Sequence, residues 1–84
     1  MSNKAQTSKN IELTHEFISY LLTAKSIPNL PKDISFVPFS KIDSKLNSAN
    51  EELLESLIKE ESPVARVEEP KTINGNWKIT PVNF

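Results

Sequence analysis

The chain of 84 residues has no cysteine, one histidine and one glycine. The absence of cysteine excludes a disulfide framework, and a single histidine leaves no conventional structural zinc site. One glycine cannot build the glycine-rich loop that cradles phosphates. No motif places a nucleophilic serine beside His15, the only histidine. We therefore expect no enzyme, no catalytic residues, no metal and no cofactor.

A strong charge of one sign is also lacking. Ten Lys and Arg residues face eleven Asp and Glu residues, which gives a formal net charge of −1 at pH 7. Because phosphate neutralisation dominates nucleic-acid affinity, a chain without a basic patch is not expected to bind nucleic acid. No apolar stretch approaches the roughly 20 residues that span a bilayer. The polar start of the chain lacks a signal-peptide pattern, so we expect a cytoplasmic protein that is not secreted and has no integral membrane segment.

Six prolines divide the chain into short pieces, and the single glycine leaves few positions for tight turns. A domain of this size buries only about 60% of its unfolded surface even when it folds well. These features predict a small, extended, mostly α protein that lies along a partner and does not fold on itself. The expected segments are a disordered N-terminus (1–10), an amphipathic helix (11–26), a proline-rich extended docking segment (27–47), a second helix (48–61) and an extended tail with a hairpin signal (62–84).

The helix expected over residues 11–26 has one apolar face. Leu13, Phe17, Tyr20 and Leu21 follow the i, i+4, i+7, i+8 spacing of an amphipathic helix. Three further aliphatic side chains widen this stripe on one side: Ile11, Ile18 and Leu22. We expect the face to dock on a partner, with Phe17 and Leu21 as its main anchors.

The second helix has a start signal but a short apolar stripe. Ser48-Ala49-Asn50-Glu51 fits a capping box, in which the Ser48 and Glu51 side chains satisfy each other's backbone donors. The apolar stripe that follows is two turns long, which is too short for stability without a packing partner.

Residues 32–36 read Lys32-Asp33-Ile34-Ser35-Phe36, which resembles the docking motif of type-1 protein phosphatase regulators. In that mode an extended peptide adds to a sheet edge, and Ile34 and Phe36 fill two pockets from one face. The alternative interpretation is an ordinary apolar strip that packs elsewhere.

The tail contains the Asn74-Gly75 pair between short β-prone runs, which favours a type I′ hairpin turn. Trp77, the largest apolar side chain of the sequence, follows this pair. We expect Trp77 to be a secondary anchor on a partner.

An aromatic-led amphipathic helix (residues 17–22) and the run Ile27-Pro28-Asn29-Leu30-Pro31 together resemble the N-terminal motif of small peroxisomal import accessory proteins, related to the KPWE-motif segment of peroxin-14-like proteins. That family has a glycine where Asn29 stands, a second Ile-Pro and a Lys-Pro-Trp-Glu motif, and this chain departs from it at each point. The resemblance implies a peroxisome-associated helper of a cargo receptor, with contacts at residues 27–30 and around Trp77.

We therefore predict a non-catalytic binding protein that docks on a larger protein or complex through short linear segments. The specific form implied by the resemblance is a helper of peroxisomal matrix protein import that acts on a cargo receptor. The alternatives are a regulatory subunit of type-1 protein phosphatase docking through residues 32–36 and a small structural subunit of a large assembly. No homo-oligomer is expected. The predicted partner-binding residues are Leu13, Phe17, Tyr20, Leu21, Ile27, Pro28, Leu30, Ile34, Phe36 and Trp77.

Overall fold

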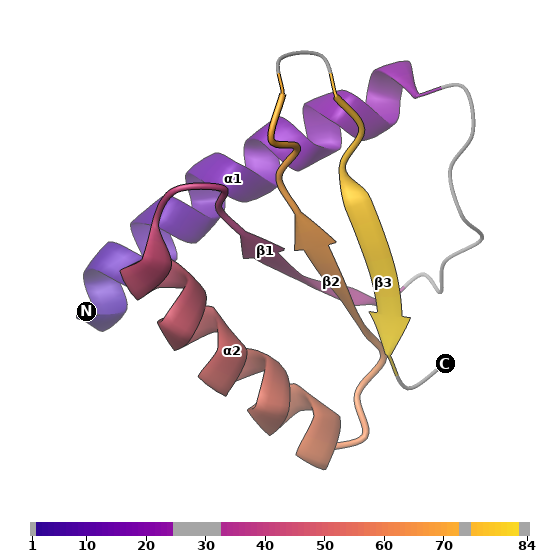
Figure 1. Cartoon of the computed structure of the whole chain (residues 1–84). Coiled ribbons are helices and arrows are strands. Elements are labelled where there is room, and N and C mark those ends of the chain that lie inside the picture. Colours follow the sequence, from indigo (N-terminus) through magenta and orange to yellow (C-terminus); the bar gives the residue numbers. More distant parts are fainter. Residues whose placement is uncertain (1, 25–32, 73–74, 83–84) are drawn as a thin grey trace.

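The computed structural model describes residues 2–24, 33–72 and 75–82, and it contains both helices and strands (Figure 1). The elements are α1 (Asn3–Thr23), β1 (Ser35–Phe39), α2 (Ser44–Lys59), β2 (Val64–Glu68) and β3 (Lys78–Val82). The radius of gyration is 12.6 Å. A folded domain of this length is expected near 12 Å, and an unfolded chain near 28 Å. The chain is thus a folded α/β domain, and the prediction of an extended, mostly α protein is wrong.

The three strands form one mixed sheet in the order β1-β2-β3. β1 runs parallel to β2, with Ser35 opposite Val64, and α2 makes the crossover that parallel neighbours require. β3 runs antiparallel to β2, with Val64 opposite Val82. Residues 69–77 connect β2 to β3.

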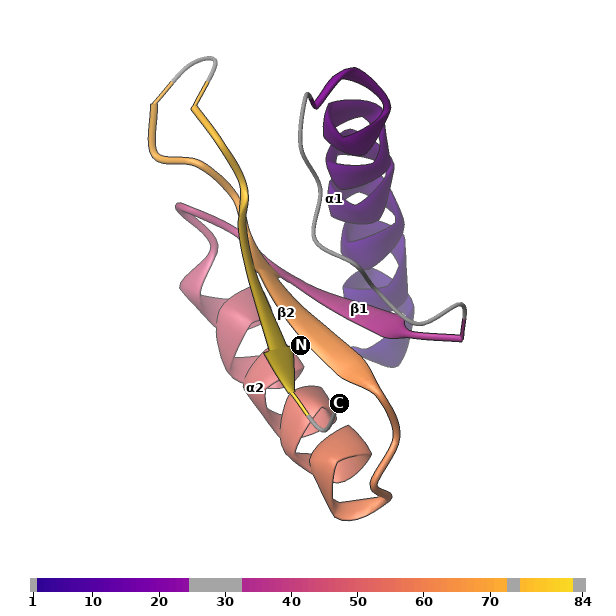
Figure 2. The same cartoon turned by 90° about the vertical axis from the view of Figure 1, so that its right-hand side faces the viewer.

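The two helices cover opposite faces of this sheet, so the molecule has three layers (Figure 2). Successive strand residues point to opposite faces. Ala65 and Val67 of β2 accordingly pack with Phe17 of α1, whereas Val64 packs with Leu54 of α2. Burial of a large apolar side chain contributes about 1.5–3 kcal/mol. The chain's own sheet therefore supplies the burial that was expected from a partner.

Helix α1 is longer than predicted at its N-terminal end. It begins at Asn3, so a disordered segment over residues 1–10 is wrong from that residue onward. Ser2 caps the helix by accepting a hydrogen bond from the Ala5 N–H at 3.1 Å. The early turns are polar, and they are held by hydrogen bonds from Gln6 and Asn10 to Asn50 of α2. An apolar-spacing rule does not detect a helix that is fixed through polar contacts.

Helix α2 also begins earlier than predicted, at Ser44. Asp43 caps it by accepting a hydrogen bond from the Leu46 N–H at 3.0 Å, so the capping box predicted at Ser48 is wrong. The longer helix gains Leu46, which is 1% exposed. This extra turn enlarges an apolar stripe that looked too short in the sequence.

The C-terminal end of α2 has a left-handed residue. Glu61 adopts a φ of 58°, and its N–H donates to the Ile58 carbonyl. The Ser62 N–H donates to the Leu57 carbonyl at 3.1 Å. This pair of bonds is the Schellman arrangement, in which glycine is the preferred left-handed residue.

The segment predicted as extended over 27–47 contains β1 and the start of α2, while residues 25–32 lie outside the described part of the chain. β1 tolerates Pro38 because of how the strand is turned. Ser35 donates to the Pro63 carbonyl and Phe39 accepts from the Glu69 N–H, so alternate residues bond to β2. Pro38 lies between them, so its backbone nitrogen faces the outer edge of the sheet, where no N–H is needed for pairing with β2.

The tail is a true hairpin, but its strands lie further from the Asn-Gly pair than predicted. Asn74 lies outside the described residues, and Gly75 does not have the positive φ of a type I′ turn. A Cβ at Gly75 would lie 2.8 Å from Thr72 Oγ1 and 2.9 Å from Pro70 Cβ. Glycine is needed here for the close approach of two chain segments.

Candidate functional site

Most of the predicted partner-binding residues point into the molecule. Phe17 is fully buried, and Leu13, Tyr20 and Leu21 pack around it against the sheet. The face of α1 that was expected to dock on a partner is thus the face that covers the protein's own strands. An amphipathic pattern shows which side of a helix is buried but does not show what buries it.

The remaining predicted anchors meet in the same core. The Phe17 ring lies 5.0 Å from the Phe36 ring and 5.3 Å from the Trp77 ring, and Ile34 packs beside them. Aromatic pairs at such spacing contribute about 0.5–1.5 kcal/mol beyond area burial. Segments that were predicted to be separate contact points are therefore brought together as one aromatic cluster. Three predicted contacts lie outside the described residues: Ile27, Pro28 and Leu30.

The outward side of α1 carries a separate apolar surface. Ile11, Ile18 and Leu22 are 65%, 45% and 83% exposed, and we call these three side chains the outer strip. Ile11 and Ile18 line a shallow groove of about 450 Å³ with Thr14 and His15. The sequence contained this signal, because the same side chains widen the apolar stripe beyond the width that the sheet covers.

The groove beside the outer strip continues toward α2. A second hollow of about 360 Å³ is lined by Leu53 of α2, and it shares Thr7 and Asn10 with the first groove. Leu53 is 38% exposed. Apolar side chains thus border both hollows, Ile11 and Ile18 of α1 in the first and Leu53 of α2 in the second.

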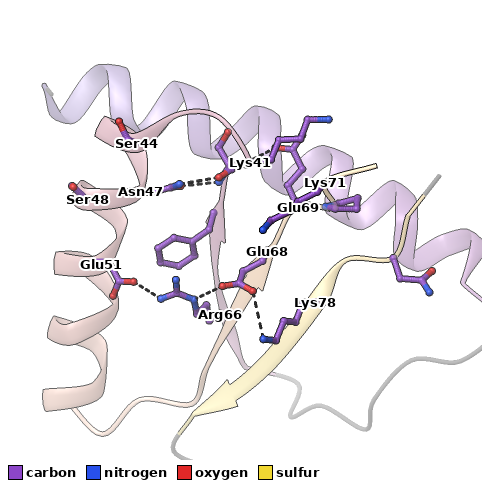
Figure 3. A pocket seen from close by; sticks show the side chains of 14 residues that line it. Lys41, Ser44, Asn47, Ser48, Glu51, Arg66, Glu68, Glu69, Lys71 and Lys78 are labelled. Carbon is purple, nitrogen blue, oxygen red and sulfur yellow. Dashed lines mark hydrogen bonds and ion pairs between the residues drawn. The ribbon is translucent and has the colours of Figure 1, made fainter. Parts of the chain in front are cut away.

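A polar hollow of about 650 Å³ lies on the α2 side of the sheet (Figure 3). It opens where β1 and β2 end and β3 begins, between the loop after Phe39 and the loop after Glu68. In α/β proteins ligands commonly bind outside the carboxyl ends of the parallel strands. This placement makes the hollow a second candidate site.

Arg66 lines the polar hollow and is held there by several contacts. Its guanidinium lies 3.8 Å from the centre of the Phe39 ring and forms ion pairs with Glu51 and with Glu68, the latter at 2.9 Å. Partial burial opposes the charge of Arg66, but its hydrogen bonds to the two carboxylates outweigh this effect and raise its pKa above the ordinary value. Lys78 lies 4.0 Å from the other Glu68 oxygen.

The loop between β1 and α2 is held in place beside these ion pairs. Asn47 accepts a hydrogen bond from the Ser40 N–H and donates one to the Ser40 carbonyl, both at 2.8 Å. The Lys41 N–H donates to Glu69 Oε2 at 3.2 Å. The walls of the polar hollow are thus held by contacts from both loops.

The described ranges contain neither a metal-binding cluster nor a membrane-spanning helix. Among those residues, no three His, Cys, Asp or Glu side chains converge to hold a metal ion. No helix there is both long and apolar enough to cross a bilayer.

Comparison with known proteins adds no relative. No protein-family model matches the chain, and no significant match to a curated protein or a solved structure was found.

Proposed function

We propose that the protein is a non-catalytic binding protein that docks on a larger protein through the outer strip of α1. The observation that supports this is the spacing of three exposed aliphatic side chains, Ile11, Ile18 and Leu22. Isolated exposed aliphatics are normal on protein surfaces. Three of them at i, i+7 and i+11 lie along one side of a helix, with Thr14 and His15 beside Ile11 and Ile18. Exposed apolar side chains gathered among polar ones are typical of an interaction surface.

The shape of the strip favours a helical segment of the partner. From Ile11 to Leu22 the helix rises about 17 Å, at 1.5 Å per residue. A partner helix with apolar side chains at i, i+3 or i+4 and i+7 fits such a strip. Surface of the partner beside that helix can also contact Leu53 of α2. A stable protein–protein interface buries about 800 Å² on each partner, which is more than three side chains on one helix offer. We therefore expect the partner to contact surface beyond the outer strip.

The resemblance to peroxisomal import accessory proteins implies a cargo receptor as partner, with contacts at residues 27–30 and around Trp77. Residues 27–30 lie outside the described part of the chain, and Trp77 is 8% exposed. Docking on type-1 phosphatase through residues 32–36 would require Ile34 and Phe36 to leave the cluster around Phe17. A small structural subunit of a large assembly would use the outer strip in the same way. The outer strip is the surface that we favour for each of these partners, because it needs no unfolding.

The test compares charge insertion on the outer strip with charge insertion elsewhere on the surface. Ile18→Lys combined with Leu22→Lys places charge on the outer strip, and Ile42→Lys places it on a loop side chain that is 85% exposed. A partner is first identified by cross-linking to wild type and then purified, with a peroxisomal cargo receptor included as one candidate. We expect the strip variant to bind the purified partner at least tenfold more weakly and Ile42→Lys to bind normally. Equal binding by all three proteins would remove the outer strip from the interface.

A further inference from the structure

The polar hollow lies where three strand ends meet, and it is independent of the outer strip. β1 ends at Phe39, β2 ends at Glu68 and β3 begins at Lys78, so these three strand ends lie at the same end of the sheet (Figures 1 and 3). The hollow of about 650 Å³ is large enough for a small molecule, since ligand pockets typically measure about 300–1,000 Å³.

The acidic groups of the hollow are already engaged. Glu51 pairs with Arg66, and Glu68 pairs with Arg66 and approaches Lys78. Glu69 accepts the Lys41 N–H. A cationic ligand would have to compete with these contacts.

The lysines of the hollow are not engaged to the same degree. The ammonium groups of Lys41 and Lys71 form no ion pair with any residue that the structure describes, and Lys78 reaches its nearest carboxylate only at 4.0 Å. Four basic and three acidic residues line the hollow, whereas the whole chain has a net charge of −1. The charged residues that line the hollow therefore sum to +1, opposite in sign to the whole chain.

The donors that remain available suit phosphate. The guanidinium of arginine can hold a carboxylate or a phosphate with two hydrogen bonds, but Arg66 is already held by Glu51 and Glu68, so the lysines are the cations left for a ligand. Lysine binds phosphate as a point charge, and the hydroxyl groups of Ser44 and Ser48 line the same wall as further donors. We propose that the polar hollow binds a small molecule that carries phosphate groups, with Lys41, Lys71 and Lys78 around its charge.

The experiment is a titration of the full-length, ¹⁵N-labelled chain with pyrophosphate, followed by two-dimensional NMR at constant ionic strength. We expect saturable shifts confined to the amides around the hollow, including Lys41, Ser44 and Lys71. Citrate, a carboxylate probe of similar charge, should bind at least tenfold more weakly.

Paired variants separate a site from general charge attraction. Lys41→Gln with Lys71→Gln removes two lysines from the hollow, and Lys4→Gln with Lys59→Gln removes two exposed lysines elsewhere, so both variants have the same net charge. The first should bind pyrophosphate at least tenfold more weakly and the second should bind as wild type does. Thermal melts check that both variants fold. If either is unfolded, the comparison of pyrophosphate with citrate in wild type decides the question alone.

Three results would overturn the proposal: shifts that never saturate, equal affinity for citrate and pyrophosphate, or equal losses in the two lysine variants. The outer-strip variant, Ile18→Lys with Leu22→Lys, should bind pyrophosphate normally. Failure of the phosphate site and failure of the docking surface are therefore distinguishable.

Discussion

The side-chain amide of Asn50 donates a hydrogen bond to the Pro38 carbonyl at 2.7 Å and so joins α2 to the outer edge of β1. Asn50 is fully buried, and its side-chain oxygen accepts hydrogen bonds from the side-chain amides of Gln6 and Asn10 of α1. Pro38 has no N–H, so its carbonyl is the only backbone polar group that it turns outward. The edge of β1 is thus closed at this point by a proline and an asparagine.

Asn50→Ala should be strongly destabilising. The substitution leaves the buried Pro38 carbonyl unsatisfied, which costs about 1–3 kcal/mol. It also removes the partner shared by the half-buried Gln6 and Asn10 amides. We expect a loss of about 2–4 kcal/mol in the free energy of unfolding, measured by urea denaturation. The matched control is Asn76→Ala, at an exposed position, which should change stability by less than about 0.5 kcal/mol. A similar effect of both substitutions would show that Asn50 does not join the layers.

Truncation of Phe17 should destabilise the protein far more than truncation of Leu22, although both residues lie on α1. Phe17→Ala removes the centre of the aromatic core and should cost about 3–5 kcal/mol, whereas Leu22→Ala removes a side chain that is 83% exposed. Urea denaturation followed by far-UV circular dichroism measures both. If Phe17→Ala is too unstable to purify, Phe17→Leu should show a smaller loss in the same direction. A near-neutral Phe17→Ala would contradict the buried face of α1.

Acidification should weaken the link between α1 and the start of α2. The hydrogen bond from Lys9 at 2.7 Å, together with the one from the Leu46 N–H, lowers the pKa of Asp43 below its ordinary value of 3.8. A carboxylate with a lowered pKa stabilises the fold above its unfolded pKa, and this stabilisation is lost as the pH falls through the folded pKa.

Asp43→Asn tests this dependence, because an asparagine keeps an oxygen for the Leu46 N–H but carries no charge for Lys9. Between pH 7 and about pH 3, the unfolding free energy of wild type should fall more steeply than that of the variant. Asp33→Asn, at an exposed position, should keep the wild-type slope. Parallel curves for wild type and Asp43→Asn would contradict the prediction.

Glu61→Gly should stabilise the protein. Glu61 has a φ of 58°, which is strained for a residue with a Cβ and free of strain for glycine. We expect a gain of about 0.5–1 kcal/mol in unfolding free energy, because the relief of strain exceeds the added entropy of the unfolded chain. Glu60→Gly is the adjacent control, since Glu60 has a φ of −78° and glycine there should be neutral or destabilising. Destabilisation by Glu61→Gly would show that this turn is not strained.

The sequence predicted the helical faces better than the architecture. The apolar spacing of Leu13, Phe17 and Leu21 correctly marks one side of α1, but burial on a partner and burial on a sheet of the same chain produce the same spacing. The prolines were misleading in a specific way. Pro38 faces the outer edge of β1 and does not interrupt pairing with β2, so a strand forms where an extended linker was expected.

The scarcity of glycine was misleading for a related reason. A positive φ occurs at Glu61 within the described residues, while Gly75 serves close packing instead of a positive φ. Few tight turns were needed, because α2 and the long connection after β2 link the strands. The polar hollow and the Asn50 contacts depend on residues far apart in sequence, and no local pattern brings them together.

The most direct test of the account is an equilibrium urea titration of the purified chain alone, followed by Trp77 fluorescence and far-UV circular dichroism. Trp77 is 8% exposed beside Phe17, so its emission reports the α1 side of the core. A single cooperative transition with the same midpoint by both probes would be the result that the account predicts. A weak helical signal that declines without a transition, with Trp77 emission typical of a water-exposed indole, would show that the chain acquires its structure from a partner and would contradict it.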